Sequence, residues 1–136
     1  MVNVVISVGS NCGDRKKSVE ETIDWLKSIL SQVQCSSIYE TPCAKHTGIP
    51  YMNVVISGFY LGQGYELEDL LKEKEHQMGR NAECREKGLV PVDIDIVILD
   101  GDITKPWDYR QKFFQIGYSQ INTGMKAVYR IPPSNI

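Results

Sequence analysis

The sequence lacks several features that would place a protein in a special structural class. Its four cysteines are widely spread and include no Cys-x-x-Cys pair, which favours reduced thiols over a zinc site or a disulfide framework. No run approaches the roughly 18 apolar residues that a membrane-spanning helix requires. The first residues carry neither the basic lead nor the small-residue cleavage site of a signal peptide. We therefore expect a cytoplasmic protein that does not bind membranes.

A strong charge of one sign is also lacking. The formal net charge is −2, which gives no support for general binding to nucleic acid. The 136 residues are 42% hydrophobic and 24% charged, a composition typical of soluble globular proteins. This length fits one domain over residues 1–136, and we expect a monomer.

The spacing of apolar residues predicts two amphipathic helices. Apolar residues recur at steps of three and four over residues 19–30, and either Asp14 or Ser18 could cap the start of that helix. A second helix is predicted over residues 67–78, with Gly79 as the residue that ends it.

Four strands are predicted around these helices. They are β-branched or aromatic runs at residues 2–8, 35–40, 51–61 and 90–99. The order β-α-β-β-α-β is that of an α+β, ferredoxin-like sandwich, an antiparallel sheet with helices on one face. Residues 80–89 show no period and are expected to form a mobile loop, and residues 107–114 are expected to form a short helix.

The last predicted strand, VPVDIDIVIL, contains two carboxylates in an apolar run. Since alternate side chains of a strand share a face, Asp93 and Asp95 should point the same way, together with Val97 and Leu99. The row expected to face the helices consists of Val92, Ile94, Ile96 and Ile98. Two carboxylates so close repel unless a cation lies between them, and Mg²⁺ is a cation that takes such ligands. The pattern alone leaves two interpretations, a magnesium site or a solvated sheet face.

Five motifs occur in the order, and with nearly the spacings, of one enzyme family. They are Val8-Gly-Ser-Asn11 followed by Gly13-Asp-Arg15, Ser37-Ile-Tyr-Glu-Thr-Pro42, Tyr51-Met-Asn53-Val-Val, Glu75-x-x-x-Gly79-Arg80 and Asp93-Ile-Asp95-Ile. From residue 1 to about Phe114 the sequence resembles the 6-hydroxymethyl-7,8-dihydropterin pyrophosphokinases of folate biosynthesis. The resemblance implies transfer of a diphosphoryl group from ATP to the hydroxymethyl group of the pterin, with release of AMP.

The resemblance also implies roles for individual residues. Asp93 and Asp95 match the pair that holds two Mg²⁺ ions on the triphosphate, and no side chain acts as a covalent nucleophile. The pterin-binding positions fall on Thr41, Pro42, Tyr51, Asn53 and Phe114. A flat heteroaromatic ring needs aromatic surfaces and fixed polar partners, which these residue types provide. The alternative for Tyr51 and Phe114 is a place in the core.

The cationic segments depart from the family pattern. The family's R-W-G-P-R segment, including its tryptophan, is absent from the stretch that ends at Pro91. Residues 9–11 lack the Gly-Lys-Ser/Thr of a P-loop and are expected to be structural. The cations expected to bind ATP are Arg80, Arg85, Arg110 and Lys112. Besides the enzyme, two other functions remain open: a ferredoxin-like pterin- or nucleotide-binding module without transfer, and a transferase for another small heterocycle.

Overall fold

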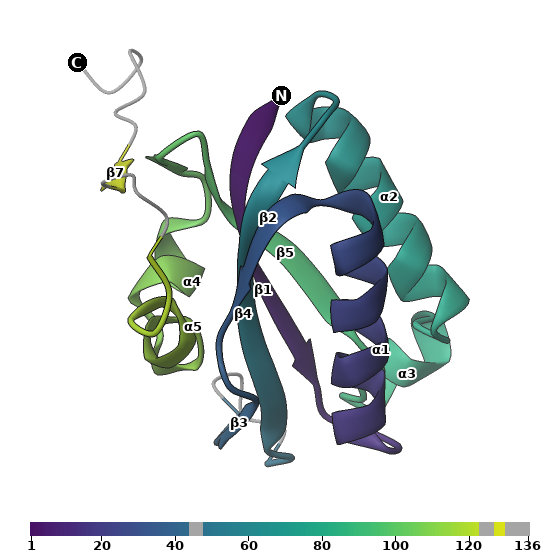
Figure 1. Cartoon of the computed structure of the whole chain (residues 1–136). Coiled ribbons are helices and arrows are strands. Elements are labelled where there is room, and N and C mark those ends of the chain that lie inside the picture. The colour runs from purple at the N-terminus through teal and green to yellow at the C-terminus, as the bar shows by residue number, and fades with distance from the viewer. Residues whose placement is uncertain (44–47, 123–126, 130–136) are drawn as a thin grey trace, which may run out of the picture.

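A computed structural model describes residues 1–43, 48–122 and 127–129 as one open sheet with helices on both faces (Figure 1). The strands are β1 (Val2–Ser10), β2 (Ser31–Cys35), β3 (Tyr39–Thr41), β4 (Tyr51–Tyr60), β5 (Asp93–Leu99), β6 (Asp102–Ile103) and β7 (Val128–Tyr129). The helices are α1 (Arg15–Ile29), α2 (Gly64–Gln77), α3 (Ala82–Glu86), α4 (Pro106–Arg110) and α5 (Lys112–Tyr118).

The sheet is built around β1. This strand pairs antiparallel with β4 on one side and with β5 on the other. The two short strands β2 and β3 both pair with β4, at opposite ends of it. Beyond β5 lie β6 and β7. The α+β class and the ferredoxin-like order of the main elements are confirmed.

The larger core lies between the sheet and the pair α1 and α2. Its buried members include Leu26 of α1, Leu71 of α2 and Ile6 of β1, and each such side chain contributes about 1.5–3 kcal/mol by leaving water. Of the two predicted caps for α1, Asp14 is used, because its carboxylate accepts a hydrogen bond from the Lys17 backbone N–H at 3.1 Å. Gly79, with φ of 99°, follows α2 as predicted.

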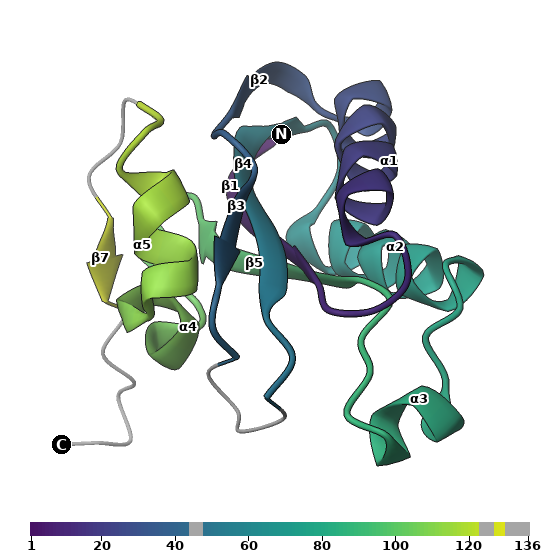
Figure 2. The same cartoon turned by 90° about the horizontal axis from the view of Figure 1, so that it is seen from below.

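The opposite face of the sheet is covered in part by α4 and α5, as Figure 2 shows. A second apolar cluster forms there from Val5, Val55, Val97, Ile98, Ile103 and Phe114. Helix α5 lies very close to the sheet at Gly117, where an added Cβ would be 2.6 Å from Val55 Cγ2. The hydroxyl of Tyr39 donates to Phe113 O at 2.6 Å and accepts from Gly117 N at 3.0 Å, so β3 anchors this helix.

A β-bulge changes the predicted faces of β5. The register with β1 shifts so that Val5 is opposite Ile98 while Ile6 is opposite Ile96. Because Val97 is the additional residue, the alternation reverses after it. Ile98 therefore joins the cluster under α5, and Leu99 packs against the main core. The predicted faces of these two residues were wrong.

Other predicted elements differ in detail. The strand predicted over 35–40 is divided between β2 and β3, and the predicted loop 80–89 contains α3. Asn81 caps α3, since its side-chain oxygen accepts from Cys84 N. The short helix predicted over 107–114 is two helices that meet at Gln111. Among the described residues, no helix is long and apolar enough to cross a membrane.

Candidate active site

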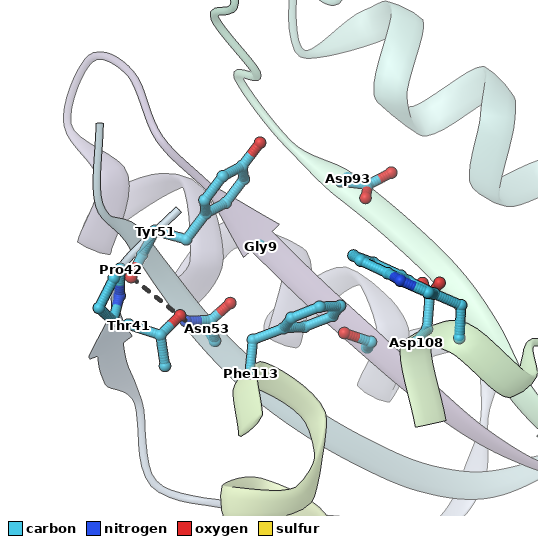
Figure 3. Close-up of a pocket in the computed structure, with 10 residues that line it drawn as sticks. Gly9, Thr41, Pro42, Tyr51, Asn53, Asp93, Asp108 and Phe113 are labelled. Carbon is cyan, nitrogen blue, oxygen red and sulfur yellow. Dashed lines mark hydrogen bonds between the residues drawn. The ribbon is translucent and has the colours of Figure 1, made fainter. Parts of the chain in front are cut away.

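One cavity, which we call the aromatic cavity, has a volume of ≈ 60 Å³ and lies where β1, β3, β4 and β5 meet α4 and α5 (Figure 3). The residues that line it are Ser7, Gly9, Thr41, Pro42, Tyr51, Asn53, Asp93, Trp107, Asp108 and Phe113. Four of the five residues predicted to bind a pterin are in this list. The structure thus brings together segments that are far apart in the sequence.

Asn53 is held rigidly in the aromatic cavity. Its side-chain nitrogen donates to Thr41 Oγ1 at 2.8 Å and to the backbone oxygens of Tyr51 and Tyr39 at 3.2 and 3.3 Å. The residue is only 2% exposed. Within the described chain its side-chain oxygen accepts no hydrogen bond, so this oxygen is available to a ligand donor.

Gly9 makes room for this arrangement. An added Cβ at this position would lie 3.2 Å from Tyr51 Cδ2 and 3.4 Å from Asn53 Oδ1. The backbone of β1 at Gly9 therefore forms the floor of the cavity between the side chains of Tyr51 and Asn53. Any larger residue would occupy space that a ligand ring could use.

Aromatic rings border the aromatic cavity on two sides. Tyr51 contributes one ring from β4 and Phe113 the other from α5, as Figure 3 shows. Trp107 of α4 lies beside Phe113, with ring centroids 6.1 Å apart. Burial, with a smaller contribution from Cys43, raises the pKa of Tyr51 to about 12. Its phenol therefore remains a neutral hydrogen-bond donor at neutral pH.

The predicted aromatic position is one residue away from the ring that lines the cavity. Phe114 is fully buried in the second core cluster, where it stacks on Tyr118 at 5.1 Å between ring centroids. Phe113 lines the aromatic cavity instead. Because successive residues of a helix point in different directions, one of the two rings anchors α5 in the core and the other faces the cavity.

A second cavity, which we call the charged cavity, has a volume of ≈ 430 Å³ and shares Asp93 with the aromatic cavity. It lies between α2, α3, β5 and the residue that precedes α4. Its charged or titratable lining residues are Glu68, Lys72, Glu75, His76, Arg80, Arg85, Asp93, Asp95 and Lys105. It is larger and more polar than the aromatic cavity, as a site for a triphosphate would need to be.

Arg80 joins two carboxylates at the wall of the charged cavity. One guanidinium nitrogen donates to Asp93 Oδ1 at 2.8 Å and to Glu75 Oε2 at 3.0 Å. The same Glu75 oxygen accepts from Ile94 N at 2.7 Å, which ties α2 to the start of β5. Burial alone would lower the pKa of Arg80, but the hydrogen bond and charge of Asp93 outweigh it and the pKa is raised.

Asp95 is the more buried of the two aspartates. Its side chain is 21% exposed, against 37% for Asp93, and Lys105 Nζ lies 2.8 Å from its Oδ1. Burial, together with the charge of Asp93, raises the pKa of Asp95 to about 6 despite the opposing effect of Lys105. The charge of Asp93 therefore acts on the neighbouring Asp95, as the sequence pattern suggested.

The turn after β1 positions the start of β5. Asn11 is 2% exposed, and its side chain accepts from Val90 N at 2.5 Å and donates to Gly88 O at 3.0 Å. Its backbone N–H also donates to Val90 O. These three bonds hold the chain just before Asp93. The predicted structural role of residues 9–11 agrees with this geometry.

Comparison with known proteins identifies the family to which this chain belongs. The family model "7,8-dihydro-6-hydroxymethylpterin-pyrophosphokinase (HPPK)" matches residues 5–123. The chain is a member of the HPPK family. A folate synthesis bifunctional protein of Arabidopsis thaliana is 34% identical over 96 residues, which cover 69% of this chain and 20% of that protein. A mitochondrial folate synthesis bifunctional protein of Pisum sativum is 35% identical over 96 residues, which cover 69% of this chain and 18% of that protein. This HPPK-family chain thus spans about a fifth of the length of these relatives.

The cations predicted for this HPPK-family site are only partly in place. Arg80 and Arg85 line the charged cavity. Arg110 and Lys112 are exposed on α4 and α5 and line neither of the two cavities. Their contact with a nucleotide therefore stays a prediction. The chain ends α4 at Arg110 and turns at Gln111, and it is Phe113 that lines the aromatic cavity.

Several lining residues were given no role by the sequence, and five of them stand out by their chemistry or their contacts. They are Glu75, Lys105, Trp107, Asp108 and Phe113. Glu75 stood within a family motif and Phe113 stood beside the predicted ring, so both carried a signal. Lys105 carried none, because only the fold of β6 and α4 brings it to Asp95.

Proposed function

We propose that this protein transfers a diphosphoryl group from ATP to the hydroxymethyl oxygen of 6-hydroxymethyl-7,8-dihydropterin, with release of AMP. The observation that carries the proposal is the position of Asp93, which lines both the aromatic cavity and the charged cavity. A pterin in the first and a triphosphate in the second would meet at the aspartates. Family membership supports the same reaction.

The aromatic cavity suits a pterin. Tyr51 and Phe113 offer ring surfaces, and stacked aromatic pairs contribute about 0.5–1.5 kcal/mol beyond area burial. The side-chain oxygen of Asn53 can accept from an amine or amide N–H of the heterocycle. Asp93 lines the same cavity, so the proposal requires that the ring binds with its hydroxymethyl group on the side of Asp93.

The charged cavity suits a triphosphate. Arg80, Arg85 and Lys105 supply positive charge, and arginine offers a planar pair of donors for phosphate oxygens. The hydroxyl oxygen of the pterin forms a bond to the β-phosphorus, and the bond from that phosphorus to the oxygen of AMP breaks. The proton of the hydroxyl group is released to solvent. The described residues need only position the two substrates and balance charge.

The donor chemistry fits Mg²⁺ only when phosphates complete its ligands. In the described part of the chain, no group of three or more His, Cys, Asp or Glu side chains could hold a metal ion. Two carboxylates with substrate phosphates are nevertheless a common Mg²⁺ environment. Asp93 and Asp95 would hold the ion, and the ion would neutralise charge on the transferred group.

The test is the Mg²⁺-dependent formation of AMP from ATP and 6-hydroxymethyl-7,8-dihydropterin. We expect Asp95→Asn to lower the rate by about 10²–10³-fold, since it removes a charged ligand at the reacting phosphate. Asp24→Asn on the exposed side of α1 is the matched control and should leave the rate unchanged. AMP formation that is absent, or that is equal in the Asp95→Asn variant, would contradict the proposal.

A second candidate is a binding module without transfer. The observation in its favour is that both aspartates already have intramolecular partners, Arg80 on Asp93 and Lys105 on Asp95. Calorimetry separates the two functions. A module would bind the pterin but show no Mg²⁺-dependent binding of α,β-methylene-ATP, whereas the enzyme would bind both.

A further inference from the structure

Lys105 reaches the aspartate pair from a connection that is fixed by hydrogen bonds. The residue before it, Thr104, donates from its hydroxyl to the backbone oxygens of Ile96 and Val97, both at 3.1 Å. The backbone N–H of Thr104 also donates to Val97 O at 2.9 Å. The bulge in β5 thus holds the segment that presents Lys105. Strand β5 therefore both carries Asp95 and holds the segment from which the Lys105 ammonium group contacts it.

Three carboxylates of the charged cavity, Glu75, Asp93 and Asp95, form one ion-paired group with Arg80 and Lys105 and are largely neutralised by the protein itself. Arg80 contacts Asp93 and Glu75, and Lys105 contacts Asp95. Three carboxylates and two cations leave one negative charge. A pair of aspartates with no such partners would call for much more metal charge to hold a triphosphate.

Lysine also has the chemistry to act on phosphate. An ammonium group is a compact charge with three N–H donors. One donor is used by Asp95 Oδ1, and Lys105 is among the residues that line the charged cavity. Two donors can therefore serve phosphate oxygens while the contact with Asp95 is kept.

We propose that the ammonium group of Lys105 takes the place of one divalent ion at Asp95. The aspartate pair then binds one metal ion, where the resemblance to the family implied two, and Lys105 supplies the other positive charge to the phosphates. The contribution of Lys105 to diphosphoryl transfer rests on the proposed function. The ion pair of Lys105 with Asp95 is independent of that function, and its effect on metal binding can be measured without turnover.

The experiment counts Mn²⁺ ions on the full chain by electron paramagnetic resonance, with and without saturating α,β-methylene-ATP. We expect one ion on the natural protein with the nucleotide analogue and two on Lys105→Met. Without nucleotide, Lys105→Met should bind Mn²⁺ about ten-fold more tightly, because a cation is removed next to the ligand. Lys105→Arg should keep the natural count. Lys27→Met removes an exposed lysine of α1 outside both cavities and should change nothing.

A double variant shows whether the effect acts through Asp95. In Lys105→Met with Asp95→Asn, the gain in Mn²⁺ binding should disappear. Two ions on the natural protein, an equal gain in Lys27→Met, or a gain that survives Asp95→Asn would overturn the inference. If α,β-methylene-ATP does not bind, the Mn²⁺ affinities of the nucleotide-free proteins alone test the inference. Absence of AMP formation would contradict only the proposed function, and two ions on an active natural protein would contradict only the role of Lys105.

Discussion

The aromatic cavity and the charged cavity share Asp93 but are built by different physical means. In the first, polar side chains on the strands are fixed by neutral hydrogen bonds, as for Asn53. The second is formed by ion pairs that link α2, β5 and the start of α4. Neutral, buried contacts can hold a ligand site ready before the ligand arrives, whereas ion pairs must be exchanged when a charged ligand enters. We therefore expect a rigid pterin site beside an adaptable nucleotide site.

The largest effect that separates the two cavities is expected from Asn53→Ala. It removes the ligand acceptor and the hydrogen bonds that hold it, at about 1–3 kcal/mol for an unpaired ligand donor, or up to about 100-fold in pterin affinity. The affinity for α,β-methylene-ATP should stay within about two-fold, which is the error typical of independent sites. Isothermal titration with each ligand measures both. Equal losses for pterin and nucleotide would show that the two cavities do not differ in this way.

Arg80→Lys should have the converse effect. Lysine keeps the charge but cannot bridge Asp93 and Glu75 as the guanidinium does. We expect nucleotide affinity to fall about ten-fold, equal to about 1.4 kcal/mol, with little change for the pterin. Arg110→Lys on the exposed surface of α4 is the matched control. A loss for Arg110→Lys as large as for Arg80→Lys would contradict this expectation and support the ATP-binding role that the sequence predicted for Arg110.

The fold and the position of the aspartate pair could be predicted from the sequence, whereas the register of β5 could not. The period of two in β5 predicted that Asp93 and Asp95 share a face, and the structure agrees because both precede the bulge at Val97. Ile98 and Leu99 follow the bulge, and nothing in their types marks the register shift with β1. The order of helices and strands was predictable because each element carries its own local period.

The wall of the aromatic cavity was predictable only in part. Tyr51 and Asn53 stand in one strand with the correct spacing, so their common side follows from period two. Phe113 and Phe114 are adjacent and chemically equal, and only the packing of α5 on Val55 decides which ring is buried. Lys105 meets Asp95 through tertiary structure alone. Long-range pairing of this kind leaves no periodic signal.

The smallest effect on ligand affinity is expected from Tyr39→Phe, which tests how α5 is held as a wall of the aromatic cavity. The variant loses the bonds to Phe113 O and Gly117 N, and the free energy of unfolding at pH 7 should fall by about 1–2 kcal/mol. Pterin affinity should fall modestly and nucleotide affinity should not change. Ser119→Ala, an exposed hydroxyl near the end of α5, is the control.

The same tyrosine predicts how stability depends on pH. Burial raises the pKa of Tyr39 from its ordinary value of 10.0 to about 12. A raised pKa in the folded state means that the stabilisation is complete below pH 10 and is lost as the pH rises through 12. Urea unfolding between pH 9 and 12 should therefore show a steeper loss for the natural protein than for Tyr39→Phe. Parallel curves would mean that this phenol does not titrate differently in the folded chain.

The central claim is that the two cavities are halves of one active site that meet at the aspartates. Proton relaxation of the pterin, measured by NMR with α,β-methylene-ATP and Mn²⁺ bound, tests it most directly. We predict that the hydroxymethyl protons relax faster than the other pterin protons in the presence of Mn²⁺, and that Mg²⁺ or Asp95→Asn removes the effect. Normal relaxation of those protons while pterin, nucleotide and Mn²⁺ are all bound would contradict the account.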